Sequence, residues 1–475
     1  MHSARIESEA NIQPQGPRPI RSLARSAFRF ALVAAASASL IGCGNTYRPV
    51  VTAINPVGPA GQPQKFAVAI STTGSTTPGL MTMVDFSGDT VLITATIGVD
   101  PYYLALDSTG NTGYTLNRDT TVNSFDLSTQ LLSSQVLQTT LLSGANPASI
   151  FPAGAYTYIS EPGRNAIANL QGAPPVLKQE FGVPNAIYVV GVANAPRVYA
   201  LGSDSSGNGQ VSTLETVSNT IDDTTIPVGK NPVYGVMTAD GKRVFVLNKG
   251  SGTVSVINSQ TNQLDILPSG KANPISVGTA PLWADFAPTR NELVVANAGD
   301  GTSPGTVSII SIPLCSATSL PNNPNCDATN PVDANGFGTV LATIPVGINP
   351  VMVAVLQDGT RAYVANAGDP TLPCAVGTAV PGVSTACSVS VINLTTNTVS
   401  ATIPSLPDGA CTTAKPVAVC GHPAYIAATS GTPTGKVYVT SLDSSNMSII
   451  RTDIDAIDTT IPLQGKGVAV RVTAP

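Results

Sequence analysis

IPVGINPVMVAVLQDGTRAYVANAGD, residues 344–369, is a strand–turn–strand unit that occurs more than once in this chain. An earlier version, IPVGKNPVYGVMTADGKRVFVLNKGSGTVSVINSQTN, begins at Ile226 with the same order of parts. In the later copy an apolar run follows Pro350, an Asp-Gly turn lies at 358–359, and residues 361–366 alternate as a second strand. Residues 388–393 and 399–403 complete four short antiparallel strands, named a to d in chain order.

The repeated unit can be anchored on seven prolines. Successive anchors are 46, 37, 48, 49, 69 and 73 residues apart, and they are Pro101, Pro147, Pro184, Pro232, Pro281, Pro350 and Pro423. Four strands about every 40–50 residues are typical of a β-propeller, because a four-stranded sheet cannot bury both of its faces alone and neighbouring blades cover them. A β-sandwich is the weaker alternative, since a sandwich does not repeat one unit seven times.

The two ends of the repeat region complement each other. Residues 461–472 match the end of strand d and a new strand a, whereas residues 65–69, 80–85 and 91–97 match strands b, c and d. Pairing these segments closes the ring and leaves no free sheet edge between the ends. We therefore expect an all-β propeller over residues 64–475, with four-stranded antiparallel blades, eight by repeat count and seven possible.

Short motifs in these units are similar to a known family. Residues 363–366 (YVAN), 245–248 (FVLN) and 438–441 (YVTS) resemble the Tyr-Val-Thr-Asn motif of the YVTN-repeat propellers, and GTVSVIN (252–258) and ATIPVG (342–347) fit the same pattern. The resemblance covers most of residues 64–475 and is strongest from 220 to 405. It implies a bacterial secreted or surface propeller, usually seven-bladed, with no single activity.

The N-terminus indicates export. Four arginines between residues 18 and 29 precede an apolar run, 30–41, that is too short to span a bilayer. The run ends in Leu40-Ile41-Gly42-Cys43, which resembles the bacterial lipobox. That resemblance implies a signal peptide over 1–42, lipidation of Cys43, a tether over 43–63, and a lipid-anchored protein of the bacterial cell envelope, periplasmic or surface-exposed. An ordinary signal peptide with a chance cysteine is the alternative.

Composition narrows the class of partner. Charged residues make up 11% of the chain, against a norm of about 25%. Of the 23 basic and 28 acidic residues, five Arg and two Glu lie in 1–42, which leaves 18 and 26 and a net charge of −8. A negative surface without basic clusters argues against nucleic acid as a partner. The expected partners are the membrane, through the lipid, and a protein or glycan; no cofactor is expected.

Six cysteines follow Cys43 and fall into three local pairs. The pairs are Cys315 with Cys326, Cys374 with Cys387, and Cys411 with Cys420. They lie in the two longest repeats, and an oxidising compartment favours three local disulfides. A metal site is the alternative, but no Cys-x-x-Cys spacing supports it. Strand order places the second and third pairs at one end of the propeller, with the longer b–c loops at 203–210, 298–305 and 367–387, and the first pair at the other end.

Few residues suit acid–base catalysis. Beyond the signal segment His422 is the only histidine, and it stands before an anchor proline where other repeats have Asn231 or Asn349. We interpret it first as a turn residue and second as a catalytic base. Asp285, on a predicted strand a, is the one carboxylate that we single out for an enzyme site.

Large side chains recur two residues after the anchor prolines. As a collar around the channel mouth they would suit sugars or planar ligands; as core residues they would wedge between blades, which we favour. They are Tyr103, Tyr234, Trp283, Met352 and Tyr425. The asparagines that end strand b, Asn248, Asn297 and Asn366, are expected to bond the nearby turn backbone rather than a ligand.

Three functions remain open at this point. The leading hypothesis is a binding or interaction module without catalysis, whose contacts concentrate on the end with the longer b–c loops. The second is a lactonase-like propeller hydrolase, which would need carboxylates or a metal at the channel mouth. The third is a structural component of the cell envelope.

Overall fold

The computed structural model describes residues 66–127, 136–268, 271–313, 336–369, 371–372, 374, 387–410, 417–429 and 435–473. The first 65 residues, with Cys43 and the predicted tether, lie outside this part of the chain. Among the described residues no helix is long and apolar enough to cross a membrane. The only described helices are single 3-10 turns, η1 (Pro162–Arg164), η3 (Pro288–Arg290) and η5 (Asp408–Ala410).

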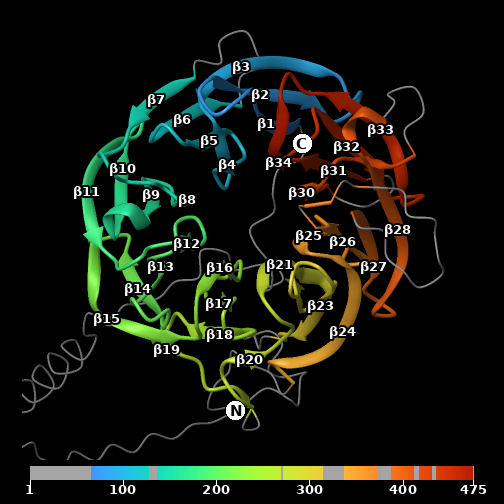
Figure 1. Ribbon diagram of the computed structural model, residues 1–475. Helices are drawn as coiled ribbons and strands as arrows, with labels where there is room; N and C mark the ends of the chain where they lie inside the picture. Colours follow the sequence, from blue (N-terminus) through green and yellow to red (C-terminus); the bar gives the residue numbers. More distant parts are fainter. Residues whose placement is uncertain are drawn as a thin grey trace, which may run out of the picture. The chain divides into compact units, whose positions relative to one another are not determined.

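The strands form eight sheets arranged in a ring, as the repeat predicts (Figure 1). Strand a lies innermost and strand d outermost in each sheet, which we call a blade. The first four blades are β4 (Pro101–Leu106), β5 (Thr112–Asn117), β6 (Thr121–Asp126), β7 (Leu137–Thr140); β8 (Ser149–Pro152), β9 (Tyr156–Glu161), β10 (Ala166–Gln171), β11 (Val176–Gly182); β12 (Tyr188–Val190), β13 (Arg197–Ser203), β14 (Gly209–Glu215), β15 (Thr220–Val228); and β16 (Pro232–Met237), β17 (Arg243–Asn248), β18 (Thr253–Asn258), β19 (Gln263–Leu264), with β20 (Ile275–Ser276) also on β18.

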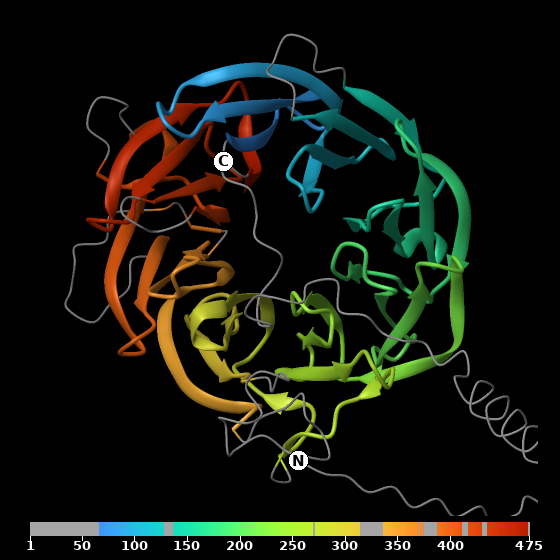
Figure 2. The same ribbon diagram turned by 180° about the vertical axis from the view of Figure 1, so that it is seen from behind.

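The other four blades follow in the same order around the ring, which Figure 2 shows from behind. Blades 5 to 8 are β21 (Pro281–Ala287), β22 (Glu292–Asn297), β23 (Pro304–Ser311), β24 (Thr339–Ile348); β25 (Pro350–Val355), β26 (Arg361–Asn366), β27 (Ser388–Asn393), β28 (Thr398–Leu406), with β29 (Val419–Cys420) parallel to β28; β30 (Pro423–Ala428), β31 (Lys436–Ser441), β32 (Asn446–Arg451), β33 (Ala456–Pro462); and β34 (Lys466–Val472), β1 (Phe66–Thr72), β2 (Pro78–Asp85), β3 (Val91–Val99).

Blade 8 is the composite that the sequence predicts. β34 pairs antiparallel with β1, with Val68 opposite Arg471 and Ile70 opposite Ala469. The backbone N–H of Phe66 donates to Thr473 Oγ1 at 2.8 Å across 407 residues of sequence. The ring therefore closes through strands from both ends of the described chain, and the count of eight is confirmed.

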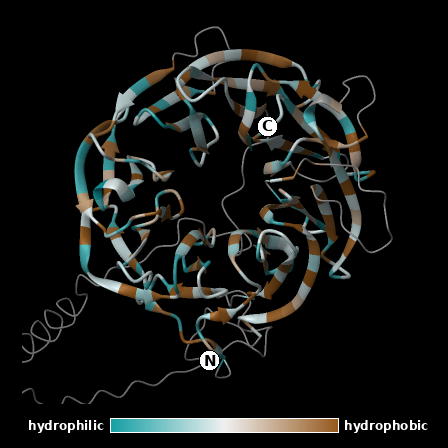
Figure 3. Ribbon diagram, viewed as in Figure 1, coloured by the Kyte–Doolittle hydropathy of each residue, from teal (hydrophilic) through white to brown (hydrophobic). Residues whose placement is uncertain are grey.

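The hydrophobic core is divided into eight clusters, one between each pair of neighbouring blades. Strands b and c are covered on both faces; β17 and β22, for example, are buried along their whole length. Outer strands such as β28 alternate between more and less exposed residues and are exposed at several positions. Figure 3 accordingly shows hydrophobic residues spread around the whole ring. Covered sheets explain the low charge content, because Ser, Thr and Asn can satisfy hydrogen bonds between blades at a smaller desolvation cost than charges.

A contact between successive blades explains why the Gly of IPVG and the Asn of YVAN recur together. A Cβ on Gly347 would lie 2.7 Å from Cγ of Asn366, and Gly229 and Gly278 meet Asn248 and Asn297 in the same way. Only glycine leaves room for this asparagine. The Asn366 side chain donates to Ser388 Oγ at 3.1 Å and Ser390 Oγ at 2.9 Å. Our expectation that it bonds turn backbone was wrong, because hydroxyls on strand c of the same blade face it directly.

Candidate functional site

A cavity of about 310 Å³ runs along the axis of the propeller and is lined by residues from strand a of all eight blades. We call it the axial cavity. Strands a line it because they are the innermost strands of the sheets, and their side chains alternate between the cavity and the spaces between blades. The large side chains two residues after the anchor prolines therefore stand at one level along the axis of this channel.

These residues serve both of the roles that we considered. Tyr234 and Met352 are 8% and 6% exposed and belong to the clusters between blades, as the core hypothesis predicts. Tyr103, Trp283 and Tyr425 are half-buried, and Trp283 packs against three of those clusters. Tyr103, Tyr234, Trp283 and Met352 also line the axial cavity. A collar and a core wedge are therefore compatible, because each side chain has one side between blades and another toward the axis.

Two further residues of this lining were missed by the sequence analysis. Tyr188 lies opposite Leu201 in blade 3, as Tyr234 lies opposite Leu247 in blade 4, but it follows Pro184 by four residues rather than two. Arg471 comes from β34, and its guanidinium lies 5.7 Å from the ring centroid of Trp283 and 5.9 Å from that of Tyr425. The sequence did contain a sign that Arg471 is unusual, because it is the one charged residue in the apolar run 468–472.

The aromatic rings form a continuous stack. Tyr234 and Trp283 stack with centroids 4.0 Å apart, and Tyr188 is tilted against Tyr234 at 4.9 Å. Burial raises the pKa of Tyr103, Tyr188 and Tyr234 well above the ordinary tyrosine value, so their hydroxyls stay neutral. Neutral phenols leave Asp285 and Arg471 as the charged side chains of the described lining.

Asp285 is held by backbone amides. Its Oδ2 accepts from the N–H of Val355 in the next blade at 2.8 Å, and its Oδ1 accepts from the N–H of Phe286 at 2.9 Å. Burial raises the pKa of Asp285 to about 6, although both amides and Arg471 oppose the shift. Asp285 is the only carboxylate of the described cavity lining, so a cluster of converging carboxylates, which would have favoured an enzyme, is not seen there.

A second cavity, of about 540 Å³, opens at the end of the propeller that carries the b–c and d–a connections. We call it the mouth cavity. It lies between blades 5, 6 and 7, and it shares Trp283 and Met352 with the axial cavity. Four of the six candidate binding residues line it, Trp283, Met352, His422 and Tyr425, whereas Tyr103 and Tyr234 belong to the axial cavity alone. Asn349, Leu442 and Asp443 contribute to the rim.

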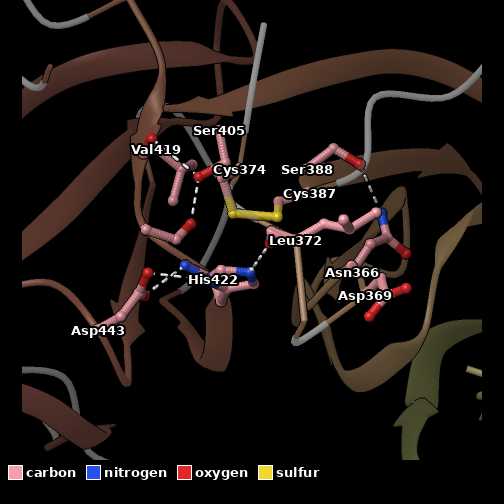
Figure 4. Close-up of a disulfide and its surroundings, with 12 residues drawn as sticks. Asn366, Asp369, Leu372, Cys374, Cys387, Ser388, Ser405, Val419, His422 and Asp443 are labelled. Carbon is pink, nitrogen blue, oxygen red and sulfur yellow. Dashed lines mark hydrogen bonds and ion pairs between the residues drawn. A yellow bond between two sulfur atoms is a disulfide. The ribbon is translucent and has the colours of Figure 1, made fainter. Parts of the chain in front are cut away.

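His422 joins two blades at this rim (Figure 4). Its Nδ1 lies 2.8 Å from Oδ2 of Asp443, and its Nε2 lies 3.0 Å from the carbonyl oxygen of Leu372. A carboxylate and a carbonyl oxygen only accept, so this arrangement suits the protonated imidazole, in which both ring nitrogens donate. Burial alone would lower the pKa of His422, but the interactions with Asp443 and Leu372 are stronger, and the net effect raises this pKa. Burial alone would raise the pKa of Asp443, but the hydrogen bonds and charge of His422 are stronger, and the net effect lowers this pKa.

The turn interpretation of His422 is correct only in part. Gly421 takes the left-handed conformation, with φ of 72°, that Asn231 and Asn349 take before their prolines. His422 is consequently free to point its ring at Asp443 and the loop of blade 6. With both ring nitrogens already in hydrogen bonds, neither is free to act as a base.

One predicted disulfide is present beside His422. Cys374 and Cys387 are bonded, with Cα atoms 5.4 Å apart, and both are buried (Figure 4). Cys420 is also disulfide-bonded. Cys315, Cys326 and Cys411 lie outside the described residues, so the pairings that involve them stay predictions. Cys374, Cys387 and His422 place their sulfur and nitrogen atoms within 4.8 Å of one another, the one metal-like group found among the described residues, but the disulfide occupies both sulfurs.

Both loop insertions of blade 6 thus reach the same end of the propeller. The b–c loop carries Cys374 and Leu372, and the d–a insertion carries Cys420 two residues before His422, which contacts Leu372. A further cavity of about 410 Å³ lies at this end between blades 3, 4 and 5, and it is lined by Asn185, Ser203, Asn231 and Lys249 among others. This cavity and the mouth cavity therefore both lie at the end that the strand order indicates.

Comparison with known proteins supports the fold alone. No family model matches the chain. Among solved structures, the dihydro-heme d1 dehydrogenase NirN in complex with DHE is 12% identical, with a TM-score of 0.57, covering 90% of this chain and 77% of that one. Apo AztD from Citrobacter koseri is 11% identical, with a TM-score of 0.53, covering 86% of this chain and 97% of that one. At such identities what is similar is the propeller, and this chain shares that architecture with both.

Proposed function

We propose that this protein is a lipid-anchored, extracytoplasmic β-propeller that binds a ligand in the mouth cavity without catalysis. The observation that carries the proposal is the composition of that cavity. It combines the rings of Trp283 and Tyr425 with the polar groups of Asn349, His422 and Asp443 in about 540 Å³. Concave, mainly apolar sites of about 300–1,000 Å³ with a few fixed polar groups are typical of small-ligand pockets.

A glycan fits this cavity best among the partners considered. A sugar ring presents a face of C–H groups to an aromatic ring and a rim of hydroxyls to amide, imidazolium and carboxylate groups. A protein partner would need a broad surface of about 800 Å² on each side rather than a pocket. His422 and Asp443 are held in place by each other, and Leu372 is held by His422, so little ordering is required when a ligand binds.

Binding is favoured over hydrolysis because the two candidate catalytic groups are already engaged. The Asp285 carboxylate accepts from two backbone amides. Both ring nitrogens of His422 are in hydrogen bonds. Neither is arranged to take a proton from water or substrate. A lactonase-like activity and a purely structural role in the envelope are therefore the outcomes that the test must separate.

The test is a thermal-shift screen of the purified chain with a glycan panel and a lactone panel, followed by calorimetry on any glycan that stabilises it. Leu442→Arg should weaken glycan binding at least about 10-fold, because Leu442 lines the mouth cavity and is 56% exposed. The matched control is Ile454→Arg, at a turn of the same blade with 59% exposure, which should bind as the parent does. Equal binding by both variants, or no glycan that stabilises the chain, contradicts the proposal; turnover of a lactone would favour the hydrolase.

Anchoring is a separate part of the proposal. The lipobox-like segment before Cys43 and the resemblance to YVTN-repeat propellers support a lipoprotein of the bacterial cell envelope. Cells that express the chain should incorporate labelled palmitate into it, and Cys43→Ser should abolish the label. Unchanged labelling of the variant would contradict the lipid anchor and leave the binding site unaffected.

A further inference from the structure

Arg471 is a cation in the axial cavity without a carboxylate partner. Arg471 is half-buried, and its Nη1 donates to the carbonyl of Val470 at 3.0 Å. No carboxylate of the described residues lies within 4 Å of it, whereas most other described arginines pair with a carboxylate, such as Arg164 with Glu180. A guanidinium has five N–H donors in a planar fork, so several of those of Arg471 remain available to a ligand.

The level of the channel at which Arg471 stands is otherwise almost uncharged. Arg471 is the fifth residue of its inner strand when Gly467 is counted as the first. In the inner strands that begin at Pro232, Pro350 and Pro423 the fifth position is occupied by Val236, Ala354 and Ala427. Asp285 stands at the same level, but its oxygens face the amides of Val355 and Phe286. Val236, Ala354 and Ala427 are small and apolar, and Phe151 stands at the same level in blade 2, so none of these side chains competes for the donors of Arg471.

The walls next to Arg471 are flat. The cation lies between the rings of Trp283 and Tyr425, and the Tyr188–Tyr234–Trp283 stack extends the aromatic surface around the channel. The faces of aromatic rings repel anions and attract planar, polarisable groups, so an anion here depends on Arg471 and a flat one also gains by stacking. A cavity of about 310 Å³ is at the small end of ligand sites, which suits one or two rings.

We propose that the axial cavity binds a small aromatic carboxylate, with the carboxylate paired to Arg471 and the ring packed beside Trp283, which lines the same cavity. A carboxylate matches the guanidinium fork with two parallel N–H···O bonds. The net negative charge of residues 43–475 does not prevent binding of a carboxylate, because distant surface charges are screened over about 8–10 Å whereas Arg471 acts at contact. This site differs in ligand from the glycan site of the mouth cavity. The two cavities share Trp283 and Met352, but Arg471, which binds the carboxylate, lines the axial cavity alone.

The experiment is calorimetric titration of the full purified chain with benzoate and 2-naphthoate. Benzamide, which is planar and uncharged, and cyclohexanecarboxylate, which is charged and not planar, are the comparison ligands. Saturable binding of at least one aromatic acid is expected, at least about 10-fold tighter than either comparison ligand. Arg471→Gln should weaken binding of the acid at least 10-fold and leave binding of benzamide unchanged.

The matched control is Arg451→Gln, an exposed arginine of blade 7 that pairs with Asp453, and it should bind the acid as the parent does. If Arg471→Gln does not fold, Ala427→Leu offers a second variant, because Ala427 is half-buried and lines the axial cavity on the blade next to β34, and a larger side chain there should also abolish binding of the acid. Absence of saturable binding of both acids, or equal affinity of Arg471→Gln and the parent, overturns the proposal. If either of these results is obtained and a glycan still binds, only the proposal for the axial cavity fails, and the proposal for the mouth cavity is retained.

Discussion

Deleting residues 465–475 tests the closure of the ring. The deletion removes β34, whose Val468, Val470 and Val472 are 5%, 0% and 4% exposed. Three buried valines contribute roughly 5–9 kcal/mol at about 1.5–3 kcal/mol each. The loss also uncovers β1, which packs in the clusters on both sides of blade 8. Since whole domains are stable by about 5–15 kcal/mol, we expect the truncated chain to lose its cooperative unfolding transition.

The assay is guanidinium unfolding followed by the fluorescence of Trp283, the only tryptophan, which lies 5.7 Å from Arg471 of the deleted strand. A milder variant, Val470→Ala, should lower the free energy of unfolding by about 2 kcal/mol, from two lost methyl groups and the cavity that they leave. Val217→Ala, at a residue that is 87% exposed, is the control and should change nothing measurable. A truncated chain with the same unfolding midpoint and emission spectrum as the parent would refute strand pairing between the two ends.

Three further outcomes follow from single contacts. Gly347→Ala should destabilise the fold by about 1–3 kcal/mol, because its Cβ would lie 2.7 Å from the asparagine of the next blade, while Gly182→Ala, with nothing within 4 Å, should be nearly neutral in the same denaturant titration. The pKa of His422 is raised, so the contribution of its protonated form to stability is complete below pH 6.5 and is lost as pH rises through the folded-state pKa. The melting temperature should therefore fall between pH 6 and pH 9, and His422→Gln should reduce this fall. An unchanged fall in the variant would exclude the ion pair with Asp443 as its cause. The pKa of Asp285 is raised from 3.8 to about 6, so the folded state binds the proton more tightly and stability should decrease by about 1–3 kcal/mol as pH rises between these values; Asp285→Asn should remove that slope, which urea unfolding at pH 4 and pH 7 would detect.

The number and order of the strands could be predicted from the sequence because their signals are local. An apolar run, an Asp-Gly turn and an alternating run lie within about 25 residues, as in 344–369, and each copy repeats the same turn chemistry. The composite blade was also predictable, since one strand a is left over at one end and strands b, c and d at the other. The end at which Cys374, Cys387 and His422 meet followed from the direction of antiparallel strands alone.

The composition of the cavities depends on the tertiary structure. Arg471 meets Trp283 only because the ring brings blade 8 to the channel near blade 5, and the sequence separation of 188 residues carries no sign of it. Tyr188 joins the aromatic stack because the hydrogen-bond register of β12 with β13, and not the distance from Pro184, sets its level. The two ring nitrogens of His422 find their partners in Asp443 and Leu372, which belong to different blades. Local patterns determine which strands form, whereas the angle of each blade around the axis determines which side chains face one another, and that angle is set by the packing of all eight interfaces together.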